Sequence, residues 1–161
     1  MSFFPSTKSA ERKKYQPNLV SLMTLCANNY MLLLKVQANH TQVGDLRSFF
    51  ISDFLSYSVI VNEVTRYTSL VTIEQKSLTG LHTLSKALKS SLHPRMTIRL
   101  YHDARMAEVV STQDIRQVKP RYDYPNTQMH QQDEKQQVNQ FLNEWLHLCL
   151  QLGQVHVELQ P

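Results

Sequence analysis

The stretch RMTIRLYHDARMAEVVS, residues 95–111, decides the fold. Apolar and polar residues alternate before and after His102-Asp103-Ala104-Arg105, which is typical of two antiparallel strands joined by a short loop. With that loop the expected cross-strand pairs are Tyr101 with Met106, Leu100 with Ala107, Arg99 with Glu108, and Ile98 with Val109. The aliphatic pairs then share one buried face, and the arginine and glutamate form an opposite-charge pair on the other.

A second hairpin is predicted over residues 59–75, with its turn inside Thr65-Arg66-Tyr67-Thr68. The expected pairs are Val64 with Ser69, Asn62 with Val71, and Ile60 with Ile73. Residues 46–52 predict a strand before this hairpin, and residues 115–120 indicate a short one after the first. Val155, Val157 and Leu159 alternate with polar residues, so we expect the C-terminus to pair at a sheet edge.

Helical periodicity is found both before and after the predicted strands. The first helix is predicted to start at Pro17 and Asn18 and to end in the polar run 37–45. Its apolar stripe is Leu19, Leu22, Met23, Cys26, Tyr30, Leu33 and Leu34. The last helix is predicted to begin with Asp133 as N-cap, with Gln136 completing a capping box, and to stop at Gly153. Its stripe is Val138, Phe141, Leu142, Trp145, Cys149 and Leu152. Residues 77–94 predict a crossover that contains a helix.

These elements predict an α+β domain of two layers, in which an antiparallel sheet of about five strands is flanked by an N-terminal and a C-terminal helix. We expect residues 1–15 to be a mobile basic tail and residues 16–161 to form the single domain. A chain of 161 residues with 42% hydrophobic and 19% charged residues is long and apolar enough to bury a core.

The charge of the chain argues against a dedicated nucleic-acid surface. The formal net charge is +4, and the first sixteen residues supply +3 of it through Lys8, Arg12, Lys13 and Lys14 against Glu11. The rest of the chain is nearly neutral, so nucleic-acid binding is disfavoured. No apolar run is long enough to span a membrane, and we expect a cytoplasmic protein. Cys26 and Cys149 form no metal-binding pattern and are expected to be buried thiols.

Three glycines leave no glycine-rich phosphate loop and no nucleophile elbow, so two polar clusters remain as candidate sites. One is His102, Asp103 and Arg105 in the central hairpin loop. The other is Arg121, Tyr122, Asp123, Tyr124, His130, Asp133 and Glu134, ahead of the last helix.

Each cluster has a functional and a structural interpretation. His102 and His130, with an acid from Asp103, Asp133 or Glu134, have the side chains of a metal site or a general acid–base pair. Arginines with tyrosines, namely Arg105, Arg121, Tyr122 and Tyr124 beside His130, also fit a phosphate or nucleotide site. Structurally, the same acids cap helices and support turns, and exposed Arg and Tyr serve protein interfaces equally well.

Three strings carry a family resemblance: RYTSLVTIEQ (66–75), MTIRLYHDARMAEV (96–109), and RYDYPN followed by MHQQDEKQQVNQFLNEWL (121–146). In these the chain resembles the YqiB family of uncharacterised proteobacterial proteins over roughly residues 15–153. The resemblance implies a small bacterial cytoplasmic protein and assigns no activity, cofactor or binding residue. The tail before Tyr15 and the segment 77–93 look longer than the family pattern.

The sequence therefore favours a non-enzymatic binding or regulatory protein, acting through the 102–105 loop and the 121–134 segment on a protein partner or a small anionic ligand. The alternative is a nucleotide- or phosphate-binding protein or a metal-dependent hydrolase. A third possibility, a dimer like the small type III secretion chaperones, rests on the order of elements alone. No cofactor is assigned, and the oligomeric state is left open.

Overall fold

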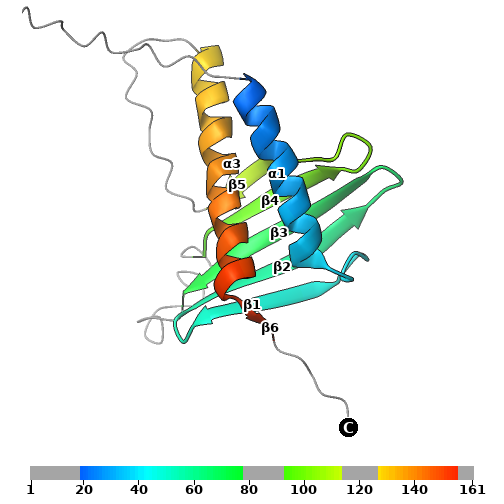
Figure 1. Cartoon of the computed structure of the whole chain (residues 1–161), viewed down its shortest axis with the longest axis vertical. Coiled ribbons are helices and arrows are strands. Elements are labelled where there is room, and N and C mark those ends of the chain that lie inside the picture. The colour runs from blue at the N-terminus through cyan, green and yellow to red at the C-terminus, as the bar shows by residue number, and fades with distance from the viewer. Residues whose placement is uncertain (1–18, 78–92, 114–126, 156–161) are drawn as a thin grey trace, which may run out of the picture.

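The computed structural model describes residues 19–77, 93–113 and 127–155, and within them the backbone alone of residues 19–20 and 127–133. Its elements are α1 (Leu19–Gln37), β1 (Leu46–Ser52), β2 (Leu55–Val64), β3 (Thr68–Ser77), β4 (Arg95–Tyr101), β5 (Met106–Gln113), α3 (Thr127–Leu152) and β6 (Gln154–Val155). The strands form one antiparallel sheet in the order β5-β4-β3-β2-β1-β6, crossed by both helices on one face (Figure 1). The predicted two-layer α+β fold is confirmed, with six strands where about five were expected.

The central hairpin has the predicted register. All four expected pairs between β4 and β5 are present, from Tyr101 with Met106 to Ile98 with Val109. The aliphatic members of these pairs lie in the core under the helices. Beyond them Thr97 pairs with Ser111, so Val110 is an extra residue in β5 and its side chain is exposed. This bulge bends the end of β5.

A second bulge corrects the predicted pairing of β2 with β3. Val64 pairs with Ser69 as expected, but Asn62 is the extra residue, so that Val61 pairs with Val71 and Val59 with Ile73. The predicted pairs of Asn62 with Val71 and Ile60 with Ile73 are therefore wrong. The shift has a clear cause, because it puts all four aliphatic side chains of the observed pairs into the core and turns Ile60 outward.

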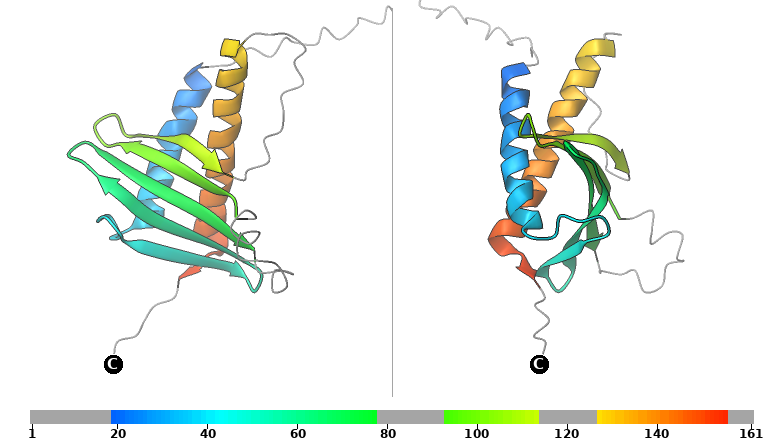
Figure 2. Two further views of the ribbon diagram at one scale, coloured as in Figure 1. Left: turned by 180° about the vertical axis from the view of Figure 1, so that it is seen from behind. Right: turned by 90° about the vertical axis from the view of Figure 1, so that its right-hand side faces the viewer.

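The two helices pack on one another as well as on the sheet (Figure 2). From α1 the core receives Cys26, Tyr30, Leu33 and Val36, whereas the predicted core residue Met23 is half-exposed. From α3 it receives Leu142, Trp145, Leu146 and Cys149, and the predicted Leu152 is exposed.

Both ends of α3 follow from local residues. The helix begins at Thr127, six residues before the predicted N-cap Asp133, so that prediction is wrong. No proline or glycine stands between the two positions, and the polar run extends the helix without a break. The end at Leu152 is as predicted. A Cβ at Gly153 would collide with the carbonyl oxygen of Cys149 and lie 2.9 Å from the ring of Phe49, so only glycine fits between α3 and β6.

A chain of buried asparagines joins the helices to the edge of the sheet. Asn139 of α3 accepts a hydrogen bond from the backbone N–H of Val109 in β5 at 3.1 Å. Asn29 of α1 donates to the backbone oxygen of Asn139 at 2.9 Å, and Asn143 donates to the side-chain oxygen of Asn29 at 2.9 Å. Because Asn29 and Asn139 have no exposed surface, these bonds fix how α1 and α3 are aligned.

Several predictions fall on parts of the chain outside the described residues: the tail, most of the crossover and the strand at 115–120. The expected edge pairing of the C-terminus is confirmed for Val155, which pairs with Phe49, and the residues after it lie outside the description. None of the described helices is long and apolar enough to cross a membrane.

Candidate functional site at the loop end of the sheet

Three connections meet at one end of the sheet, which we call the loop end: residues 38–45, 65–67 and 102–105 (Figure 1). Backbone hydrogen bonds join 102–105 to 65–67 and hold 38–45 against β2. The N–H of His102 donates to the carbonyl oxygen of Tyr67 at 2.9 Å, and that of Val61 donates to Asp45 at 3.0 Å. Residues far apart in the sequence therefore form one continuous surface.

His102 is held at the loop end by hydroxyl groups on both of its ring nitrogens. Its Nδ1 lies 3.0 Å from the Tyr30 hydroxyl of α1, and its Nε2 lies 2.8 Å from Ser69 Oγ of β3. The Tyr30 ring also packs edge-on against the imidazole, with centroids 5.8 Å apart. Both hydroxyl-bearing residues are buried, at 6% and 7% exposure, so the imidazole connects α1 to the sheet.

The chemistry open to His102 follows from these contacts. A neutral imidazole donates from one nitrogen and accepts at the other, and a hydroxyl serves in either sense. The distance from Ser69 Oγ to Nε2 suits a nucleophile and its base, but a tyrosine stands where a carboxylate would orient the ring. Within the described ranges no three metal-ligating side chains lie together. The geometry is that of an anchor for the loop.

The loop that His102 anchors exposes charged side chains. Asp103 accepts a hydrogen bond from the N–H of Ala104 at 3.0 Å, which supports the turn as predicted. Arg105 has a φ of 55°, a left-handed conformation that is uncommon outside glycine. Its guanidinium lies 3.7 Å from the sulfur of Met31 on α1 and is otherwise exposed to solvent.

The neighbouring turn adds a pair that sequence reasoning missed. The guanidinium of Arg66 stacks over the ring of Tyr67 at 5.2 Å, and both side chains are exposed. The pattern of residues 65–68 predicts only a turn, and nothing in it indicates that this turn lies beside the 102–105 loop. The two turns are neighbours because β3 pairs with β4 in an antiparallel direction, which places Thr68 opposite Tyr101.

The second predicted cluster is only partly described. Arg121, Tyr122, Asp123 and Tyr124 lie outside the described residues, and His130 and Asp133 are placed by backbone alone in the first turns of α3. That end of α3 rises beyond the edge of the sheet, and α1 passes between it and the 102–105 loop (Figures 1 and 2). Of the predicted site residues, the structure brings together His102, Asp103 and Arg105.

The expected ion pair between Arg99 and Glu108 is replaced by another. The two residues are opposite each other in register, but Glu108 bonds Lys135 of α3 at 2.9 Å. The hydrogen bond and the negative charge of Glu108 raise the pKa of Lys135. Arg99 has no hydrogen-bond or ion-pair partner in the described part of the chain, so it cannot be set aside as already paired.

Both thiols are buried and free, as predicted. Burial, with a smaller contribution from the charge of Glu108, raises the pKa of Cys26 to about 11. Burial raises that of Cys149 to about 12. Because the thiolate is the reactive form, neither residue is poised for nucleophilic chemistry.

Comparison with known proteins gives one consistent result. The uncharacterised protein YqiB of Escherichia coli strain K12 is 43% identical over 141 residues, which cover 88% of this chain and 94% of that protein. The YqiB proteins of strains O6:H1 and O157:H7 match to the same extent. No solved structure shows a significant match. Residues 32–155 match the family described as protein of unknown function DUF1249, and the chain belongs to that family.

Proposed function

We propose that this protein is a non-enzymatic binding module that acts through the loop end of the sheet. The observation that carries the proposal is that both ring nitrogens of His102 are engaged by Tyr30 and Ser69. These two hydrogen bonds fix the 102–105 loop in place. A rigid loop loses little conformational entropy when a partner binds.

The backbone conformation of Arg105 also supports the proposal. A non-glycine residue in the left-handed region costs roughly 1–2 kcal/mol, which glycine would avoid. What arginine adds over glycine at this position is its side chain. Its exposed guanidinium is suited to two parallel hydrogen bonds with a carboxylate or phosphate.

We infer that the partner is a protein that presents an acidic group. Arg66, Tyr67 and Arg105 lie at the same end of the sheet and are exposed, and arginine and tyrosine are the residues that most often dominate protein interfaces. A cytoplasmic location belongs to this proposal, since two free thiols suit a reducing compartment. The 121–134 segment remains a proposed extension of the surface.

The test compares proteins recovered from a cell lysate by the wild-type chain with those recovered by variants. Arg105→Gly removes the guanidinium without straining the backbone, and Lys76→Ala removes an exposed positive charge elsewhere on the sheet. We expect a set of proteins that Arg105→Gly loses and Lys76→Ala retains. Recovery of the same proteins by all three chains would refute the proposal, and Arg121→Ala tests the proposed extension.

One contact favours the alternative, a hydrolase: Ser69 Oγ lies 2.8 Å from His102 Nε2. A fluorophosphonate probe reacts with activated serines and separates the two functions. The binding-module proposal expects no labelling, whereas labelling that disappears in Ser69→Ala would establish the hydrolase. A thermal scan with Zn²⁺, Mn²⁺ and nucleotides extends the test to metal or phosphate chemistry, because a ligand at a hundred times its dissociation constant stabilises by about 2.7 kcal/mol.

A further inference from the structure

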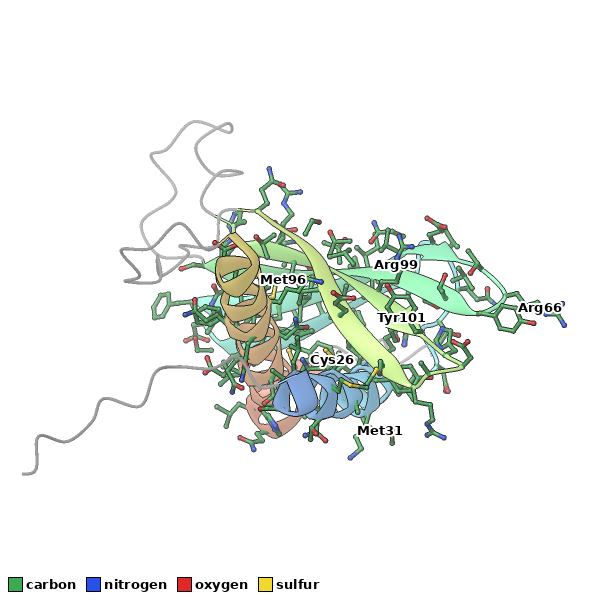
Figure 3. All side chains as sticks on the ribbon, turned by 90° about the horizontal axis from the view of Figure 1, so that it is seen from above. Cys26, Met31, Arg66, Met96, Arg99 and Tyr101 are labelled. Carbon is green, nitrogen blue, oxygen red and sulfur yellow. The ribbon has the colours of Figure 1, made fainter. Side chains whose placement is uncertain are left out.

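The sheet has a second face, away from the helices, which we call the outer face. On it stand Leu46, Phe50, Ile60, Glu63, Leu70 and Arg99. Ile60, Leu70 and Arg99 each lie between two buried residues of their strand, and Phe50 follows the buried Phe49. Leu46 is paired with Ile60 and Glu63 with Leu70, so both lie on the same face. Figure 3 shows Arg99 on the side of the sheet away from α1 and α3, whereas Met31 lies with the helices. The apolar members Leu46, Phe50 and Ile60 are exposed.

Two arginines on this face have donors that nothing described here satisfies. Arg99 is half-buried and makes no hydrogen bond or ion pair with a described residue, and Glu108 opposite it bonds Lys135 instead. Arg95, four residues earlier on the same side of β4, has a buried Nε that makes no hydrogen bond. A partly desolvated cation gains from an acceptor, and no described residue supplies one, so both arginines are available to an acceptor on a partner.

We propose that the outer face binds a second copy of this chain, and that Arg99 of each copy pairs with Glu63 of the other. The register supplies the geometry: Leu70 of β3 is opposite Arg99 on β4 and opposite Glu63 on β2. A two-fold axis along β3 above Leu70 brings β4 of one copy over β2 of the other. It therefore sets Arg99 against Glu63 twice, with the two Leu70 side chains between them.

The face is complementary to itself in charge and sufficient in area. Glu63 is exposed and has no ion-pair partner in the described ranges, so it is available to the cation that lacks one. Strands of seven to ten residues, about 4.8 Å apart and rising about 3.3 Å per residue, give β1–β5 a flat footprint of roughly 600 Å². Side chains standing on it bring the accessible area near the roughly 800 Å² per partner of a standard interface.

The experiment measures the mass of the full chain in solution by light scattering or sedimentation, at concentrations up to about 100 µM. We expect twice the 18.8 kDa of one chain. Arg99→Glu and Glu63→Arg each place like charges together at both contacts, so each variant alone should dissociate at least about a hundredfold more readily. Lys35→Glu, an equal change of charge on α1, should leave the dimer intact.

Mixing the two variants is the decisive step. Arg99→Glu and Glu63→Arg chains together restore an opposite-charge pair at both contacts, so the mixture should form a heterodimer that neither variant forms with itself. This result also demonstrates that both variants are folded. Three results would overturn the proposal: a monomeric wild type, a dimer that is insensitive to Arg99→Glu, or a mixture that stays monomeric although circular dichroism shows both variants to be folded.

Discussion

At the scale of single residues, His102 shows which features a local sequence pattern predicts and which it does not. Its position at the end of a strand and the support that Asp103 gives the turn were predicted from the hairpin alone. Its partners were not, because Tyr30 and Ser69 are 72 and 33 residues away in the sequence. Each is an ordinary residue of a helix stripe or a strand, and only the packing of α1 on the sheet turns them toward the imidazole.

Removing one of these hydroxyls measures the strength of the anchor. We expect Tyr30→Phe to lower the free energy of unfolding by about 1 kcal/mol, because it deletes a hydrogen bond beside the core and keeps the ring contact. Urea unfolding checks this. Tyr67→Phe, at an exposed ring, is the matched control and should change stability by less than about 0.5 kcal/mol. Equal effects of the two substitutions would show that the contact does not anchor the loop.

Arg105 offers a test of stability against binding. Arg105→Gly should be about 1 kcal/mol more stable than Arg105→Ala, since both lack the guanidinium and only glycine relieves the left-handed backbone. The comparison in urea isolates the backbone cost. Unfolding of both variants at the same urea concentration would mean that the left-handed backbone of Arg105 carries no cost that glycine relieves.

At the scale of elements, the two hairpins were predictable because alternation fixes both the strands and their facing residues. The bulges at Asn62 and Val110 were not, since an extra residue leaves no mark until the core selects which side chains it accepts. The start of α3 was misplaced for the opposite reason: Asp133 carries a strong capping signal, but the polar residues before it sustain the helix. The contact of α1 with α3 through asparagines had no sequence signal, because buried amides look like surface residues.

Asn139 should therefore be among the most sensitive polar positions. We expect Asn139→Ala to lower the free energy of unfolding by about 2–3 kcal/mol, since it leaves the N–H of Val109 without an acceptor and removes a donor to the carbonyl oxygen of Lys135. Amide hydrogen exchange should accelerate first at Val109. Asn28→Ala, one residue from Asn29 but exposed, is the control and should not destabilise the protein, because alanine is the better helix former. A similar loss there would mean that the effect does not come from the buried hydrogen bonds of Asn139.

At the scale of the whole molecule, the layers, the two hairpins and much of the core followed from periodicity, whereas the grouping of loops at the candidate site did not. The 102–105 loop was recognised, but its neighbours 38–45 and 65–67 become part of the same surface only when β2, β3 and β4 are laid side by side. Sequence spacing carries no information about which turns share an end of a sheet.

The buried thiols make global stability depend on alkaline pH. Both pKa values are raised from 9.0, to about 11 for Cys26 and about 12 for Cys149, so between pH 9 and 11 the unfolded chain has lost protons that the folded chain retains. The contribution of the two buried, protonated thiols to stability is complete below pH 9 and is lost as pH rises. The free energy of unfolding should therefore fall by roughly 2–3 kcal/mol between pH 8 and 10. Urea unfolding at both values checks it. The double variant Cys26→Ala, Cys149→Ala should lose clearly less stability over this interval, and an unchanged loss would exclude the thiols as its source.

The hydrogen bond from Val109 to Asn139 also affects how readily the protein aggregates. An outermost strand with unsatisfied backbone groups recruits further strands, and that is how fibrils grow. Here the side-chain oxygen of Asn139 on α3 accepts a hydrogen bond from the outward N–H of Val109 in β5. A bulge at Val110 distorts the strand next to that position. Edge-to-edge polymerisation is obstructed on that side by two residues, so substitutions at Asn139 should first be noticed as aggregation during expression.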